Sequence, residues 1–340
     1  NHTIVNYDNN DASNWGLTPG QQYGGQYYET SRDKERYFQF DAARDVAWGA
    51  INKIQMGYKY TNHDNSVSSR GNAVDVVNAL NLTEIAGGMS PGGLYDGLGA
   101  SGDLTDWTTA DLGKAIAYFN TLAPRGPYNY NYGPSFSLKE ITTALYAQAD
   151  FEAGKWRGNV GVRFVDTSDK SLYWVSRTGG YDQALANRSY KKALPNFNVA
   201  YELNDDMVAR FSAAKVIARP RYGQMAGTFD ITDEPRGEFV GTASGGNVDL
   251  KPYEATNYDL AFEWYFAPSS MLAAEVFRRD ITNYVVTVTT PRQLTNPITG
   301  NSGVYEASQP INVSDAKATG VALIYQHSFD NGFGINAIFT

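Results

Sequence analysis

The chain has 340 residues, no cysteine and a formal net charge of −8. The absence of cysteine excludes metal-thiolate sites, disulfides and a cysteine nucleophile, and the acidic balance argues against a nucleic-acid partner, which requires a basic face. The mean hydropathy of −0.42 and the lack of any apolar run of about 18 residues exclude a transmembrane helix. They do not exclude membrane strands, in which only every second side chain faces lipid.

The aromatic content is high, with 24 tyrosines and 16 phenylalanines. Tyrosine suits the interfacial girdles of a membrane barrel, because its ring lies in the lipid boundary while its hydroxyl reaches water. A soluble β protein rich in tyrosine is the alternative that composition leaves open.

Alternation of apolar and polar residues predicts about ten strands, arranged in hairpins. The pattern is clearest where Leu145 and Phe151 share one face and Glu140 and Gln148 share the other. The predicted hairpins cover residues 36–61, 138–176, 194–216, 253–289 and 314–340, and their short turns lie at 45–49, 153–155, 204–206, 267–269 and 330–332.

Long connections separate these hairpins, at about 62–137, 177–189, 219–252 and 290–311. The first of them contains two possible short helices, near 73–86 and 107–122. Short and long connections alternate, as in an up-and-down barrel whose connections fall on its two ends in turn. A Greek-key sandwich gives no reason for this rhythm, and strands of about 12–16 residues exceed the usual soluble length of about 5–6. The sequence therefore predicts an all-β protein, a transmembrane antiparallel β-barrel with long extracellular loops.

Catalytic and metal-binding chemistry is not expected. The histidines His2, His63 and His327 form no pair with ligand spacing, and no nucleophile elbow, P-loop or dinucleotide fingerprint occurs in a fitting context. We predict neither an enzyme nor a bound cofactor.

Aromatic and polar residues of the long loops are the candidate ligand-binding residues, because flat rings beside amides suit a ligand with an apolar face and a polar rim. They are Trp107, Tyr128, Asn129, Tyr130, Asn131, Tyr132, Trp174 and Tyr181. Packing of the rings against each other is the alternative. Arg219 and Arg221 flank Pro220 and have two readings: they bind an anionic ligand, or they pair with lumen carboxylates or lipid headgroups.

Several segments together resemble the barrel of proteobacterial TonB-dependent receptors. The most specific is the G-N-x-x-L-K-P element. The main segments are Leu194-Pro195-Asn196-Phe197-Asn198, Arg219-Pro220, Gly246-Asn247-Val248-Asp249-Leu250-Lys251-Pro252, Asn257-Tyr258-Asp259-Leu260 and Glu263-Trp264-Tyr265-Phe266. The segments at 6–10, 14–17, 137–140, 146–151 and 158–163 resemble the same subfamily. The resemblance implies a 22-stranded outer-membrane barrel filled by an N-terminal plug. We expect residues 1–340 to be a barrel segment of such a receptor, from which the plug is absent.

The resemblance also implies a function and a location. Such receptors lie in the bacterial outer membrane and import a bulky nutrient when the inner-membrane TonB complex pulls on the plug. An oligosaccharide is the favoured nutrient and an iron chelate is the competitor. The expected partners are outer-membrane lipid, the TonB complex through the missing plug, and the nutrient itself. A passive porin and a soluble β enzyme acting on polysaccharide remain as alternatives, although the sequence offers no defensible acid–base pair for the enzyme.

Overall fold

The computed structural model describes residues 16–17, 22–75, 80–91, 107–122, 127–233, 235, 240–297, 299–313 and 315–340. The contacts divide the chain into two compact units. The smaller unit comprises Asn1–Thr30 and Ser68–Asn131, and the larger comprises Ser31–Val67 and Tyr132–Thr340.

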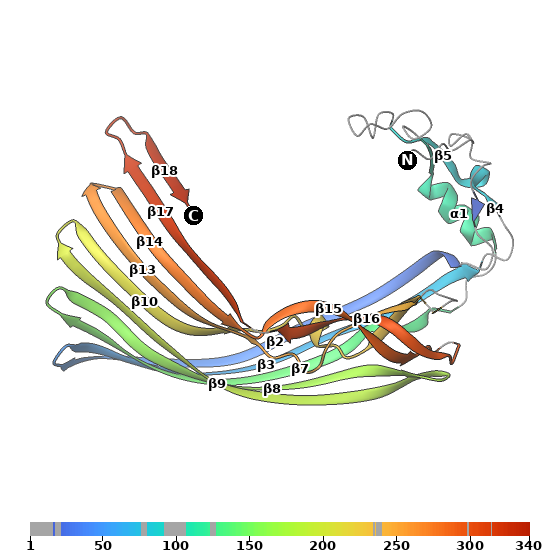
Figure 1. Cartoon of the computed structure of the whole chain (residues 1–340), viewed down its shortest axis with the longest axis horizontal. Helices are drawn as coiled ribbons and strands as arrows, with labels where there is room; N and C mark the ends of the chain where they lie inside the picture. The colour runs from blue at the N-terminus through green and yellow to red at the C-terminus, as the bar shows by residue number, and fades with distance from the viewer. Residues whose placement is uncertain are drawn as a thin grey trace. The chain divides into compact units, whose positions relative to one another are not determined.

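A ten-stranded sheet is the main feature, with the strand order β18-β17-β14-β13-β10-β9-β8-β7-β3-β2 (Figure 1). Its strands are β2 (Gln22–Trp48), β3 (Ile51–Asp75), β7 (Asn129–Ala153), β8 (Trp156–Arg177), β9 (Gly180–Asn204), β10 (Met207–Ala218), β13 (Tyr253–Ala267), β14 (Ser270–Thr282), β17 (Ala316–Ser328) and β18 (Gly334–Phe339). The predicted all-β class and the predicted number of about ten strands are confirmed. Among the residues that the structure describes, no helix is long and apolar enough to cross a membrane.

Each predicted short turn lies at a strand connection. The connections are residues 49–50, 154–155, 205–206, 268–269 and 329–333. Gly49 and Gly154 have φ angles of 62° and 60°, which glycine adopts without the steric penalty of a Cβ atom. These glycines therefore allow two-residue turns between long strands.

The predicted loop at 177–189 is wrong. β8 continues to Arg177 and β9 begins at Gly180, so the two strands pair without interruption from Arg177–Gly180 to Trp156–Tyr201. Polar residues such as Asp182 suggested a loop, but a strand that extends beyond the membrane needs no apolar face to keep its backbone ladder.

The predicted loop at 62–137 is shorter than expected, because β3 continues to Asp75 and β7 begins at Asn129. Its described residues, with Gly16–Leu17, form part of the smaller unit. They contain β4 (Leu80–Asn81), which pairs with β1 (Gly16–Leu17). The 3₁₀ helix η2 (Leu82–Ile85), the strands β5 (Ala86–Met89) and β6 (Thr108–Ala110) and the α-helix α1 (Leu112–Leu122) follow. The helix predicted near 107–122 is confirmed by α1, whereas the described part of 73–86 contains strand ends and the four-residue 3₁₀ helix η2 instead of an α-helix.

The predicted loops at 219–252 and 290–311 are also wrong, since they fold together into a second sheet of the order β11-β12-β16-β15. This inner sheet consists of β11 (Phe229–Asp233), β12 (Gly241–Gly245), β15 (Tyr284–Thr295) and β16 (Ser302–Val313), and η4 (Tyr222–Met225) precedes it. β12 and β16 are parallel and join the two segments. Asn283, at a φ angle of 57°, lies between β14 and β15. Asparagine tolerates this left-handed conformation better than most residues, and here it interrupts what the sequence suggested was one strand.

The inner sheet packs on one face of the main sheet, as Figure 1 shows for β15 and β16. Leu138 of β7 is buried in a cluster with Met225, Leu250 and Val285. Because side chains alternate between the faces of a strand, Leu138 defines the covered face of β7, which we call the inner face. The opposite face is the outer face.

The G-N-x-x-L-K-P element is the junction between these parts. The backbone N–H of Asn247 donates to the Gln224 carbonyl at 2.7 Å, and the Asn247 side chain donates to the Pro310 carbonyl at 3.0 Å. Leu250 is only 1% exposed, and the backbone N–H of Lys251 donates to Asn312 Oδ1 at 2.7 Å. The element thus fastens the segment after η4 to β16 and to the buried cluster.

Gly246 permits this junction because a Cβ atom there would lie 1.9 Å from the carbonyl oxygen of Ala226. We expect Gly246→Ala to destabilise the inner sheet by at least about 1 kcal/mol, seen as faster hydrogen exchange of β11 and β12. Gly223→Ala is the control, since a Cβ atom at Gly223 meets no atom within 4 Å. Equal exchange in the two variants would contradict this role of Gly246.

Candidate functional site

The outer face of β7–β9 changes from apolar to polar at one level. On β8 it carries Trp156, Val160 and Phe164 and then Asp166 and Lys170. The register places Phe164 opposite Leu145 and Ala193, and places Asp166 opposite Thr143 and Lys191. The apolar stretch 156–164 matches the roughly 9–11 residues that a tilted strand needs to cross hydrocarbon. We therefore place one membrane boundary between the levels of Phe164 and Asp166.

Aromatic rings mark the other boundary, at the end of the short turns. Trp156 and Tyr201 lie with ring centroids 4.4 Å apart, and Phe266 stacks with Tyr325 at 6.2 Å. Such rings form the interfacial girdles of membrane barrels. The apolar band continues across the sheet, because Val276 and Val321 are 51% exposed and lie opposite each other on β14 and β17.

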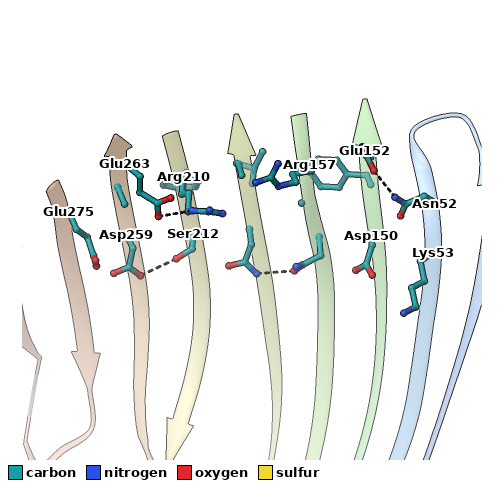
Figure 2. Close-up of a pocket in the computed structure, with 18 of the residues that line it drawn as sticks. Asn52, Lys53, Asp150, Glu152, Arg157, Arg210, Ser212, Asp259, Glu263 and Glu275 are labelled. Carbon is teal, nitrogen blue, oxygen red and sulfur yellow. Dashed lines mark hydrogen bonds and ion pairs between the residues drawn. The ribbon is translucent and has the colours of Figure 1, made fainter. Parts of the chain in front are cut away.

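The inner face is polar at the level where the outer face is apolar (Figure 2). Ion pairs and amide pairs cross from strand to strand, from Asn159–Asn198 at 2.8 Å to Arg210–Glu263 at 2.8 Å. Arg157 also pairs with Glu202. Carboxylates outnumber cations along this groove: Asp45, Asp150, Glu152, Asp259, Glu263 and Glu275 line it together with Lys53, Arg157 and Arg210. The inner face therefore offers an acidic, hydrogen-bonding surface.

A buried cluster of charges lies further along the inner face, beyond the membrane boundary. Glu140 and Asp169 lie directly opposite each other on β7 and β8 and are 3% and 6% exposed. Arg219 Nε lies 3.1 Å from Glu140 Oε2 and 3.1 Å from the Tyr190 hydroxyl. The sequence suggested two roles for Arg219, and the structure contains one of them, the ion pair with a carboxylate on the inner face of the main sheet.

Tyr222 of η4 makes a second contact with the main sheet, through His63 of β3. Its hydroxyl is hydrogen-bonded to His63 Nδ1 at 2.7 Å, and the two rings meet edge to face at 4.9 Å. Burial raises the pKa of Tyr222, and the nearby Glu140 carboxylate raises it further. The phenol therefore stays neutral and keeps its hydrogen-bonding proton. Sequence reasoning missed Glu140, Asp169 and Tyr222, because their partners are remote in the chain.

Three of the predicted ligand-binding aromatics meet in one group, which we call the aromatic trio: Tyr132, Trp174 and Tyr181. Tyr132 stacks on Tyr181 at 4.3 Å and meets Trp174 edge-on at 4.9 Å. On β8, Trp174 lies on the same face as Phe164, and the register places Tyr181 on that face as well. The alternation thus places Trp174 and Tyr181 on the outer face, and the three rings of the trio pack against each other as the alternative reading expected. Contact with a ligand remains a prediction.

The remaining predicted residues lie in the smaller unit or beside η4. The Trp107 carbonyl accepts from the backbone N–H of Ser90 at 2.8 Å, and the Trp107 backbone N–H donates to Ser90 Oγ at 2.9 Å. The Tyr128 hydroxyl donates to Gln26 at 3.0 Å. Asn129, Tyr130 and Asn131 begin β7 in the smaller unit. Arg221 precedes η4, where its backbone N–H donates to the Gln224 side chain at 3.0 Å. The ligand-binding role of all these residues also remains a prediction.

Comparisons with known proteins agree with this architecture. The family model described as TonB dependent receptor-like, beta-barrel, matches residues 1–340, so the chain belongs to that family. No curated protein matches the chain. Two similar solved structures are the ferric yersiniabactin uptake receptor FyuA from Yersinia pestis and the ferric-catecholate import receptor Fiu from E. coli K12.

Both receptors are 13% identical to the chain, with TM-scores of 0.50 for FyuA and 0.53 for Fiu. The matches cover 92% and 91% of this chain but only 35% and 38% of the respective receptors. The chain thus spans little more than a third of their length, and at this identity the likeness shows the fold. Members of the family are outer-membrane transport receptors and not enzymes, so this sheet is part of an outer-membrane barrel.

Proposed function

We propose that the whole protein imports a bulky nutrient across the outer membrane by TonB-coupled active transport. The observation that carries this proposal is that the main sheet has a polar inner face with a hydrogen-bonding groove and an apolar outer face. Such a wall suits a lumen through which a polar solute passes. The inner-membrane TonB complex supplies the energy through a plug that fills the lumen.

An oligosaccharide is the nutrient that the inner face favours. The groove is acidic, and two of its three cations, Arg157 and Arg210, are already paired with carboxylates. Carboxylates and amides hydrogen-bond sugar hydroxyls without the repulsion that an anionic chelate would meet. A neutral polyhydroxylated solute is therefore compatible with this surface.

An iron chelate is the second candidate. FyuA and Fiu are named for ferric yersiniabactin and ferric-catecholate uptake. Arginine suits the recognition of anionic chelates, and Arg221 is exposed, with no ion-pair partner within the described part of the chain. This candidate therefore requires cations such as Arg221 to lie on the ligand path.

A fluorescence titration of the full-length receptor separates the two nutrients. We expect oligosaccharides to change the tryptophan emission, and we expect Trp107→Phe or Trp174→Phe to reduce the change at least about twofold if either ring contacts the sugar. A response to ferric chelates but not to oligosaccharides would identify the iron chelate as the nutrient. Steady ion conductance through the full-length protein, without a nutrient response, would instead indicate a passive porin.

A further inference from the structure

Two buried carboxylates of the inner face have no part in the transport proposed above. They are Glu140 and Asp169, which lie directly opposite each other on β7 and β8 and which we call the carboxylate pair. We propose that the pair shares one proton, and that this proton holds η4 and the inner sheet against the main sheet. Loss of the proton leaves two buried negative charges side by side, and detachment of η4 relieves them by admitting water.

The carboxylate pair is closed off from water and incompletely bonded. Glu140 and Asp169 are 3% and 6% exposed. Directly opposite residues of two antiparallel strands have Cβ atoms about 4.5–5.5 Å apart, and like charges in this position destabilise the sheet. Glu140 Oε2 and Asp169 Oδ1 have no hydrogen-bond partner within the described part of the chain. A proton held between the two carboxyl groups removes one of the charges and supplies a hydrogen bond.

The cations beside the carboxylate pair do not balance both of its charges. Arg219 Nε lies 3.1 Å from Glu140 Oε2, but 38% of the Arg219 side chain is exposed, so solvent screens this ion pair. Arg188 lies opposite Asp169 on β9, yet its guanidinium donates to the Val248 carbonyl at 2.9 Å. In the described ranges Asp169 has no ion-pair partner. One guanidinium therefore faces two carboxylates, and a proton neutralises the second.

Further ionisable groups face the pair from β2, β3, β8, β9 and η4. Those that line the cavity beside the pair are Glu35, Lys59, His63, Arg163 and Tyr222. His63 is itself paired with Asp33 and lies 3.7 Å from Glu35, and the Tyr190 hydroxyl accepts a hydrogen bond from Arg219. In the structure as described, none of these groups forms an ion pair with either carboxylate. None of them therefore takes the place of the shared proton.

η4 lies beside the carboxylate pair and is attached to the main sheet at both of its ends. At its start the Tyr222 hydroxyl is hydrogen-bonded to His63 Nδ1 at 2.7 Å. At its end Met225 packs against Leu138, and the Met225 carbonyl accepts a hydrogen bond from Ser171 Oγ at 3.3 Å. Leu138 and Ser171 lie opposite each other in the row next to the pair on the same face. Detachment of η4 therefore opens the pair to water.

The sign of the pH dependence follows from the burial of the pair. Burial raises the pKa of Glu140 to about 7, although Arg219 lowers it, and the charge of Asp169 and a hydrogen bond between the two carboxyl groups raise it further. Burial raises the pKa of Asp169 as well. When η4 detaches, the pKa of Glu140 falls toward its ordinary value of 4.5. The attached state thus binds more protons, so attachment is strongest below about pH 4.5 and weakens as the pH rises to about 7.

The test is hydrogen exchange of residues 222–233 in the full-length receptor at pH 5.5 and pH 8.5, with each rate divided by the intrinsic rate of that amide at the same pH. If detachment returns the pKa of Glu140 from about 7 to 4.5, the equilibrium constant for opening rises about 30-fold between these two pH values. Glu140→Gln is expected to reduce this rise to less than about threefold, because the amide binds no proton.

Asp169→Asn is a second variant, which keeps Glu140 in place. It removes the neighbouring charge that raises the pKa of Glu140, so the pH dependence moves to lower pH and the rise between pH 5.5 and pH 8.5 becomes smaller. A rise that survives both Glu140→Gln and Asp169→Asn, or that is absent from the unsubstituted receptor, would overturn the proposal.

His63→Gln is the matched control. Histidine is a residue type that changes charge between about pH 5 and pH 8, and His63 contacts η4 through Tyr222. The rise is expected to persist in His63→Gln. Its loss there would assign the proton to the histidine, and the proposal would then be wrong. No nutrient enters these measurements, so they are independent of the transport proposal.

Discussion

Replacing Val160 by arginine is expected to destabilise the full-length receptor in lipid by roughly 2–4 kcal/mol. Val160 lies midway along the apolar stretch of β8, 49% of it is exposed, and its strand partners are Ala149 and Phe197. An arginine at this depth is surrounded by hydrocarbon on its exposed side. The measurement is the urea dependence of folding into lipid vesicles.

Ser168→Arg is the matched control for Val160→Arg. Ser168 lies on the same strand and the same face but beyond Asp166, so arginine there reaches water or headgroups. We expect a cost of at most about 1 kcal/mol, as for interfacial positions of barrels. Equal losses at residues 160 and 168 would contradict a membrane boundary between the levels of Phe164 and Asp166.

The hairpins could be predicted from the sequence because each membrane-spanning strand repeats a local rule. Leu145 and Phe151 face outward, while Glu140 and Gln148 face inward, and no knowledge of the partner strand is needed to recognise this alternation. The five short turns follow for the same reason, since each lies between two alternating runs. Which strands pair, and in what register, is not encoded in this local pattern.

The inner sheet was missed because its pairing is not local. Gly241 pairs with Tyr305, and the spanning strands β13 and β14 lie between them in the chain. A short run such as Gly241–Gly245 has no alternation of its own. Its strand conformation depends on hydrogen bonds from another segment, so sequence reasoning assigned loops at both places.

The candidate site was predicted in part. The grouping of Tyr132, Trp174 and Tyr181 required the hairpin of β8 and β9 to continue through 177–189, where the sequence suggested a loop. Once that continuation is known, counting by twos from Phe164 places Trp174 on the outer face. The two readings of Arg219 could be separated only by its contact with Glu140, and these two positions are 79 apart in the numbering.

Removing the Arg219 guanidinium is the second change with a large expected effect. Glu140 and Asp169 face each other at a buried position of the wall, and Arg219 Nε lies 3.1 Å from Glu140 Oε2. Breaking a fully buried pair costs about 3–5 kcal/mol. Because 38% of the Arg219 side chain is exposed, solvent screens part of this loss. We therefore expect Arg219→Ala to destabilise the attachment of η4 by about 2 kcal/mol.

Hydrogen exchange of residues 222–233 in the full-length receptor measures this attachment. Arg221→Ala is the control, because Arg221 contributes backbone hydrogen bonds at the start of η4, which alanine retains. Its expected cost is within about 0.5 kcal/mol. If the unpaired carboxylate is the cause, adding Glu140→Gln to Arg219→Ala restores much of the protection at a pH well above the pKa of Glu140, which burial raises to about 7 even beside Arg219. At such a pH a neutral amide opposite Asp169 removes the repulsion between two buried carboxylates. Equal exchange in the single and double variants would show that the lost packing of the arginine stem, and not its charge, had held η4 to the wall.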